Sequence, residues 1–119
     1  GSSRLCLFRE NSSRSLRHHL EEGALLPCDR GAAGHVIRAW GDCVDDRAIE
    51  VLDERFAESE GERDPDISAI AVPVLARQGH LLGALALSGP SSRFTREKRH
   101  NILQTLQNHA TECGDRLSG

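Results

Sequence analysis

Two apolar runs separated by a short turn place the strongest constraint on this fold. Almost every position is apolar in the two segments Ile67–Leu75 and Leu81–Leu87. Each segment is therefore predicted to be a strand that is buried on both faces. The turn residues Gln78 and Gly79 lie between them and favour a β-hairpin. Pro73 has no amide hydrogen to donate. We therefore expect it at a sheet edge, at a bulge or at a position whose amide would face away from the neighbouring strand. The hairpin is predicted to form the centre of an antiparallel sheet.

Helical spacing of apolar residues predicts two helices before this hairpin. The first covers residues 30 to 40, with Asp29 as its cap and Gly41 at its end. The second begins at Asp45 or Asp46. Its predicted inward face consists of Ile49, Leu52 and Phe56.

A third helix is predicted after the hairpin, capped by Thr95. Its apolar positions recur at three and four residue steps and predict one continuous inward stripe. The members of this stripe are Ile102, Leu103, Leu106, Ala110, Cys113 and Leu117.

The remaining segments are predicted as a hairpin and a loop. The candidate strands of the hairpin are Leu5–Phe8 and Leu16–Leu20. Pro27 is predicted to end the segment that follows them. Ser59–Asp66 lacks a period and is predicted to be an acidic, solvated loop. The order of elements indicates a single α+β domain over residues 1–119, with an antiparallel sheet flanked by helices.

Composition excludes several functional classes. The 119 residues carry a net charge of −3 and no long basic cluster, so this chain alone is not expected to bind DNA. No apolar run is long enough to cross a membrane. The four cysteines lack the paired short spacing of structural zinc sites, and we expect free thiols in the cytoplasm, without a bound metal or cofactor.

The Gly31–Gly34 segment is the most informative local feature. Four small residues at a predicted helix start expose backbone amides, and the helix dipole there favours a carboxylate or a phosphate. The alternative interpretation is that these residues only allow the helix to pack tightly on the sheet.

Three other groups of residues have both a chemical and a structural interpretation. Cys28 with His35 and Asp29 would form a nucleophile and base, but Asp29 is also a helix cap. His109 and Cys113 lie four residues apart on one helix face and would supply two metal ligands or simply pack. The acids at positions 58, 60, 62, 64 and 66 would be catalytic, would hold a metal or, as charge runs usually do, would form a solvated loop.

Several blocks of this sequence resemble the C-terminal effector-binding domain of IclR-family bacterial transcriptional regulators. The resemblance covers about residues 4 to 117 and depends most on the block that ends in Gly89-Pro90 before Arg93. The matching blocks are Gly23–Pro27, Gly31–Gly34, Ala69–Val74 and Gly83–Pro90.

This resemblance implies a GAF/PAS-like fold without enzymatic activity that binds a small organic, often carboxylic, metabolite. In the family, a separate N-terminal winged helix-turn-helix domain binds DNA, and it is absent from this sequence. Backbone amides that hold the effector correspond to Ala32 and Ala33, and one of two strand hydroxyls corresponds to Ser88. The resemblance assigns effector binding to Cys28, Gly31, Ala32, Ala33, Gly34, Ser59, Ala69, Ala86 and Ser88.

Departures from the family pattern at Ala69 and Ala86 predict a pocket that is more apolar than that of regulators sensing the smallest acids. A family cysteine corresponds to Ala69, and the second hydroxyl corresponds to Ala86. The resemblance also implies a homodimer or homotetramer. Two alternatives remain open at this point: a GAF-like thiol redox enzyme that uses Cys28, and an oligomerisation module that binds no ligand.

Overall fold

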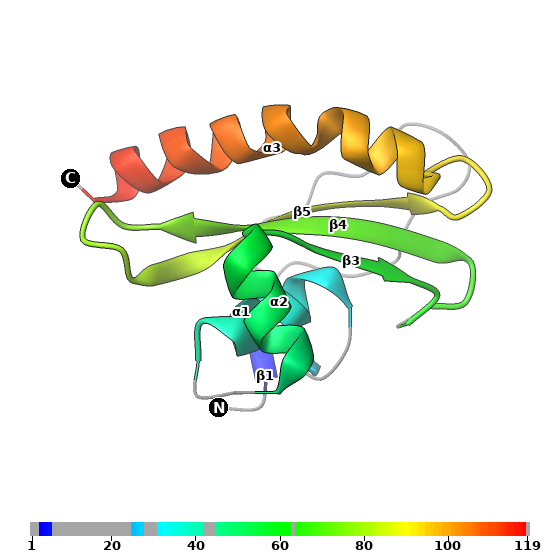
Figure 1. Cartoon of the computed structure of the whole chain (residues 1–119), viewed down its shortest axis with the longest axis horizontal. Helices are drawn as coiled ribbons and strands as arrows, with labels where there is room; N and C mark the ends of the chain where they lie inside the picture. The colour runs from blue at the N-terminus through cyan, green and yellow to red at the C-terminus, as the bar shows by residue number, and fades with distance from the viewer. Residues whose placement is uncertain (1–2, 6–24, 28–30, 42–44, 63, 119) are drawn as a thin grey trace.

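The computed structural model describes residues 3–5, 25–27, 31–41, 45–62 and 64–118. Within these residues the chain forms five strands and three helices in an α+β arrangement (Figure 1). In chain order they are β1 (Ser3–Leu5), β2 (Leu25–Pro27), α1 (Ala32–Ala39), α2 (Asp46–Glu54), β3 (Ala57–Glu60), β4 (Ile67–Leu75), β5 (Leu81–Pro90) and α3 (Arg96–Leu117).

Strands β3, β4 and β5 form an antiparallel sheet with β4 in the middle. The predicted hairpin is therefore confirmed, although β5 continues three residues beyond Leu87. The register of β4 against β5 shifts between Val74 and Leu75. This irregularity lies next to Pro73, for which a bulge was one of the expected positions. Strand β4 is buried on both faces, whereas β5 has several exposed side chains, so the prediction of burial on both faces is wrong for β5.

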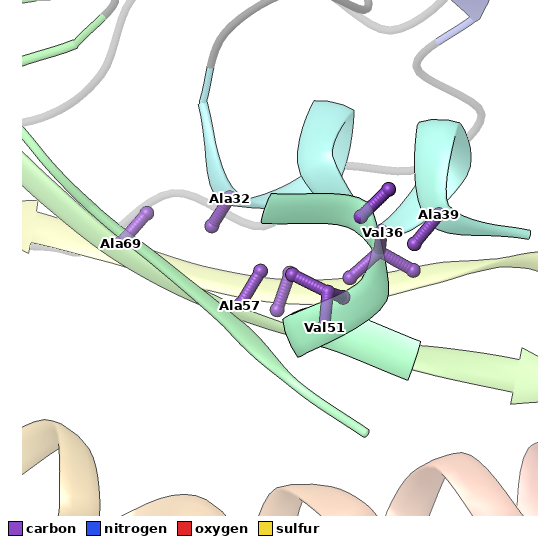
Figure 2. Close-up of a cluster of buried hydrophobic side chains, with 8 residues drawn as sticks. Ala32, Val36, Ala39, Val51, Ala57 and Ala69 are labelled. Atoms are coloured by element: carbon purple, nitrogen blue, oxygen red, sulfur yellow. The ribbon is translucent and has the colours of Figure 1, made fainter. Parts of the chain in front are cut away.

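The sheet separates two layers of helix. Helix α3 lies along one face, α1 lies against the other, and α2 packs on α1 at that side of the sheet (Figure 1). On the α1 side, the sheet contributes small residues to a cluster that includes Val36 and Val51 (Figure 2). On the α3 side, Ile70, Val72 and Val74 pack against Leu106 and other helix residues. Because strand residues alternate between faces, β4 presents alanine to the helix pair and larger side chains to α3.

Helix α3 packs so closely on β4 that it requires glycine at one position. A Cβ atom added to Gly114 would lie 2.2 Å from the carbonyl oxygen of Leu75. The buried positions Leu106, Ala110 and Gly114 follow a spacing of four residues. The predicted stripe is therefore wrong at Cys113 and Leu117, which are exposed, since the contact continues through Gly114 instead.

Helix α2 begins where predicted, because the Asp45 side chain accepts a hydrogen bond from the Ala48 amide at 2.8 Å. Its inward face differs from the prediction. Ala48 and Val51 are buried, whereas Ile49 is 56% exposed and Leu52 is 41% exposed. Phe56 lies beyond the helix, which ends at Arg55 in the left-handed conformation.

Part of the predicted acidic loop is a strand. Ala57–Glu60 forms β3 with alternating burial, and it pairs with β4, so the expectation of a loop is wrong for Ser59 and Glu60. The alternation in this short segment places small residues inward and carboxylates on the opposite face.

At the beginning of the chain, β1 pairs with β2 in antiparallel register from Ser3 opposite Pro27 to Leu5 opposite Leu25. Pro27 therefore ends a strand that the sequence did not predict. Most of the predicted hairpin, including 16–20, lies outside the described residues. No helix in the described part of the chain is long and apolar enough to cross a membrane.

Candidate functional site

The Gly31–Gly34 segment forms the first turn of α1. Gly31 is the N-cap, with φ at 84°, a conformation that glycine adopts without steric cost. The N-cap is thus Gly31, and the predicted cap Asp29 lies outside the described residues. Ala32 belongs to the buried cluster between α1 and the sheet (Figure 2). The small residues thus allow close packing, and they also place the first amides of α1 beside the sheet.

The predicted strand residues of the site share one face of the sheet. Ser59 is directly opposite Ala69, and Ala69 is directly opposite Ser88. Directly opposed residues of antiparallel strands point to the same side, so these three form the Ser59–Ala69–Ser88 row. Ala69 packs in the same cluster as Ala32, which shows that the row faces α1. Ser59 and Ala69 are buried, whereas Ser88 is exposed.

A second row beside it contains Ala86. Ala57 is opposite Ala71, and Ala71 is opposite Ala86, on the same face of the sheet. Ala86 is exposed like Ser88, so the outer part of this face remains uncovered next to the start of α1. The structure thus brings eight of the nine predicted effector-binding residues to one side of the sheet. The ninth, Cys28, lies outside the described residues.

Glu62 is a residue at this place that sequence reasoning missed. Its Oε1 atom accepts a hydrogen bond from the Gly31 amide at 3.2 Å and lies 2.6 Å from Nε2 of His35. The acidic run containing Glu62 was interpreted mainly as a solvated loop, and no spacing rule connects it with a helix start 31 residues earlier. His35 was a candidate base for Cys28, but among the described residues its ring is bonded to Glu62.

The imidazole of His35 is held in an enclosed environment. Its side chain is 9% exposed, against 31% for that of Glu62. Nδ1 of His35 is buried and has no hydrogen-bond partner among the described residues. Within the described part of the chain, no side chain other than Glu62 caps the start of α1. The first turn therefore combines amides that have no acceptor within the helix, a buried imidazole and one carboxylate from a distant loop.

A separate ion-pair network lies on the opposite face of the sheet. Arg99 donates to Glu58 at 3.2 Å, to the Phe94 carbonyl at 2.6 Å and to Glu60. His100 lies 2.9 Å from Glu58. The acids at positions 58, 60 and 62 each have a partner side chain, which corrects the prediction of a merely solvated run, although the Glu60 side chain remains mostly exposed.

The hollow beside this network is distinct from the predicted site. Its volume is about 170 Å³, which is smaller than the roughly 300 Å³ at which small-molecule pockets begin. Side chains of both charges line it, so it offers no single-sign environment. The lining residues are Arg47, Glu50, Val51, Glu54, Phe56, Ala57, Glu58, Arg96 and His100.

The proposed metal ligands remain isolated. Among the described residues, no group of three or more histidine, cysteine or acidic side chains has a geometry suitable for a metal ion. His109 and Cys113 are both exposed on α3. Nothing in the described residues therefore supplies the third and fourth ligands that this pair would need.

Comparison with known proteins identifies the family. The family model of the bacterial transcriptional regulator IclR C-terminal domain matches residues 49–114, more than half of the chain. The chain is 24% identical over 136 aligned residues to the HTH-type transcriptional regulator KdgR of Dickeya chrysanthemi. That alignment covers 93% of this chain and 45% of KdgR, so the chain spans about half the length of the curated relative it matches.

Solved structures share the fold at low sequence identity. The match to a transcriptional regulator from Rhodococcus sp. RHA1 covers 99% of this chain and 58% of the regulator's chain, with a TM-score of 0.89 and 18% sequence identity. IclR of Thermotoga maritima matches 100% of this chain and 58% of its own, with a TM-score of 0.87 and 17% identity.

The inducer-binding domain of PobR from Acinetobacter, solved as a double mutant with 3-hydroxybenzoic acid, is another match. It covers 87% of this chain and 74% of its own, with a TM-score of 0.75 and 22% identity. The relatives named here are transcriptional regulators and not enzymes, in agreement with the sequence prediction. The family match and the shared α+β fold together show that this chain belongs to the IclR family of bacterial transcriptional regulators and corresponds to their C-terminal, effector-binding domain.

Proposed function

We propose that this chain senses a small organic acid and controls DNA binding by an N-terminal domain of the same regulator. The observation that carries the proposal is the first turn of α1, whose amides lie beside the Ser59–Ala69–Ser88 row. A helix start favours an anion through its unsatisfied amides and its dipole. The single domain over residues 1–119 supplies the binding site, and the winged helix-turn-helix supplies the contact with DNA.

The ligand's acid group docks on the amides of Ala32, Ala33 and Gly34, with the Ser88 hydroxyl as a further donor. Cys28, Gly31 and Ser59 complete the polar part of this proposed site. Ala69 and Ala86 present methyl groups where a thiol and a hydroxyl would add polarity. The body of the ligand is therefore apolar, a choice that agrees with the aromatic acid bound by the PobR domain.

The regulatory mechanism is a population shift. A ligand that binds one arrangement of subunits more tightly than another changes the spacing of the attached DNA-binding domains. This mechanism requires at least a homodimer, acting in the cytoplasm where the DNA is. The chain alone does not bind duplex DNA at physiological salt, because its net charge of −3 does not favour phosphate contacts.

A thermal-shift screen of small aliphatic and aromatic carboxylates tests the proposal. A ligand that binds only the folded chain raises the unfolding temperature by mass action. The variant Ala33→Leu places a bulky side chain at the proposed acid site, so it should abolish the ligand-induced shift while the protein remains folded. Thr111→Leu, on the exposed side of α3, is the control variant and should keep the shift.

The absence of any shift across the panel would contradict acid sensing and favour the module that only oligomerises. A shift that persists in Ala33→Leu would place the ligand elsewhere.

A further inference from the structure

Glu62 already places a carboxylate where the proposed effector would place its own. Its Oε1 atom is bound by the Gly31 amide and lies 2.6 Å from Nε2 of His35. These are the kinds of donors that recognise a carboxylate, and they are on the same helix turn as Ala32, Ala33 and Gly34. Two carboxylates at one helix start repel each other, and both compete for the same dipole.

We propose that Glu62 is an internal competitor for the acid group of the effector, which must displace it in order to bind. This inference rests on the proposed function of the first turn of α1 as an acid-binding site. Because Glu62 is part of the same chain, it competes at a fixed high effective concentration. The apparent affinity for an external acid is the intrinsic affinity multiplied by the fraction of molecules in which Glu62 has left this place.

The loop that carries Glu62 allows its side chain to leave without unfolding the sheet. The backbone of the loop is closed by hydrogen bonds from the Gly61 amide to the Ile67 carbonyl and from the Ile67 amide to the Asp64 carbonyl. Neither bond involves the Glu62 side chain. That side chain is 31% exposed, so a rotamer change moves the carboxylate toward solvent while the backbone is retained.

His35 couples the departure of Glu62 to the arrival of another acceptor. Its side chain is only 9% exposed, and its Nδ1 atom has no hydrogen-bond partner in the part of the chain that the structure describes. If Glu62 left without replacement, the described part of the chain would offer no partner to either ring nitrogen. Leaving buried polar atoms unpaired is unfavourable. A ligand that brings a carboxylate oxygen to Nε2 removes this penalty, so the exchange selects acids.

The test compares sodium benzoate binding to the wild-type chain and to two variants, by calorimetric titration at constant ionic strength. Glu62→Gln removes the charge but keeps an acceptor oxygen for Gly31, and Glu62→Ala removes the group. Both should bind benzoate more tightly, by about tenfold for Glu62→Ala, within the usual 5- to 150-fold range of coupling between sites. Asp64→Asn makes the same charge change on the same loop, keeps the acceptor used by the Asp66 amide and should change affinity less than twofold.

The outcomes separate this inference from the proposed function. Equal benzoate affinity in the wild-type chain and both Glu62 variants would overturn the competitor while leaving acid sensing intact. Weaker binding in the variants would overturn it too, since Glu62 would then contact the ligand. An equal gain in Asp64→Asn would reduce the effect to general charge and overturn the specific competition. No benzoate binding to any of the proteins, combined with a carboxylate panel that fails on the wild-type chain, would overturn the acid-binding site itself.

Discussion

Arg99 joins three segments of the chain although it is almost completely buried. Its guanidinium donates to the carboxylates of Glu58 and Glu60 on β3 and to the backbone carbonyl of Phe94 just before α3. The planar fork of arginine suits several acceptors at once, which a lysine ammonium does not reproduce. This one side chain therefore fixes the start of α3 against the edge strand of the sheet.

Replacing Arg99 with alanine should destabilise the fold by about 2 to 3 kcal/mol, less than for a fully buried ion pair because Glu60 is mostly exposed. The change removes the Arg99 donor from the Phe94 carbonyl and from Glu58, which keeps only His100 among the described side chains, and it also removes packing. Urea denaturation followed by circular dichroism measures the loss. The neighbouring variant Lys98→Ala, on the exposed side of α3, should change stability by less than about 0.5 kcal/mol. Equal losses in the two variants would contradict the role of Arg99.

Helix α3 and strand β4 are in close backbone contact at Gly114. In an isolated helix, alanine is more favourable than glycine by about 1 kcal/mol. Here the added Cβ would lie 2.2 Å from the carbonyl oxygen of Leu75, a contact with backbone that no side-chain rotation relieves. The steric term should exceed the propensity term, because overpacking a rigid contact costs about 1 to 3 kcal/mol or more.

Gly114→Ala should therefore lower the free energy of unfolding, even though helix propensity alone predicts an increase. Chemical denaturation measures the sign directly. The matched variant Cys113→Ala changes the exposed neighbouring residue and should leave stability within about 0.5 kcal/mol. A stabilised Gly114→Ala protein would show that α3 shifts easily away from β4.

Helices and strands whose apolar residues recur at regular spacing could be predicted from the sequence. The face that an element buries could not be predicted where tertiary contacts determine it. The hairpin of β4 and β5 and the caps Asp45 and Thr95 follow from local patterns. Strand β3 was missed because its inward residues are only Ala57 and Ser59, which carry little hydrophobic signal. The inward face of α2 was missed for a related reason, since small Ala48 and Val51 pack on the sheet instead of the larger Ile49 and Leu52.

The candidate site shows the same division. The Gly31–Gly34 segment was found from its small residues at a predicted helix start, and the strand positions were found through a resemblance that fixes their order along the chain. Their meeting on one sheet face follows from the strand register. Glu62 could not be predicted, because its contact with Gly31 and His35 depends on how the β3–β4 connection folds back over α1.

At the scale of the whole molecule, large apolar side chains remain exposed on more than one element. Ile49 and Leu52 lie on the outward side of α2, Leu82 and Leu87 on β5, and Leu117 near the end of α3. Single exposed apolar residues are normal, but a pair on one helix face favours contact with another surface. The family resemblance, which implies a homodimer or homotetramer, points in the same direction.

We expect the chain to self-associate, and the double variant Ile49→Glu with Leu52→Glu to weaken this association by charging the exposed face of α2. Analytical ultracentrifugation over a concentration series gives the mass of each species. Gln104→Glu with Asn108→Glu, on the exposed side of α3, adds the same charge away from α2 and should leave association unchanged. A wild-type chain that remains strictly monomeric at high micromolar concentration would contradict the prediction.

Amide chemical shifts, measured by nuclear magnetic resonance, show directly which residues a ligand contacts. They therefore test whether an acid ligand binds at the first turn of α1 and beside β5. During titration with sodium benzoate at constant ionic strength, we expect saturable shifts at Ala32, Ala33, Gly34 and Ser88. Shifts confined to the hollow around Glu54 and His100, or no saturable shifts at all, would contradict it.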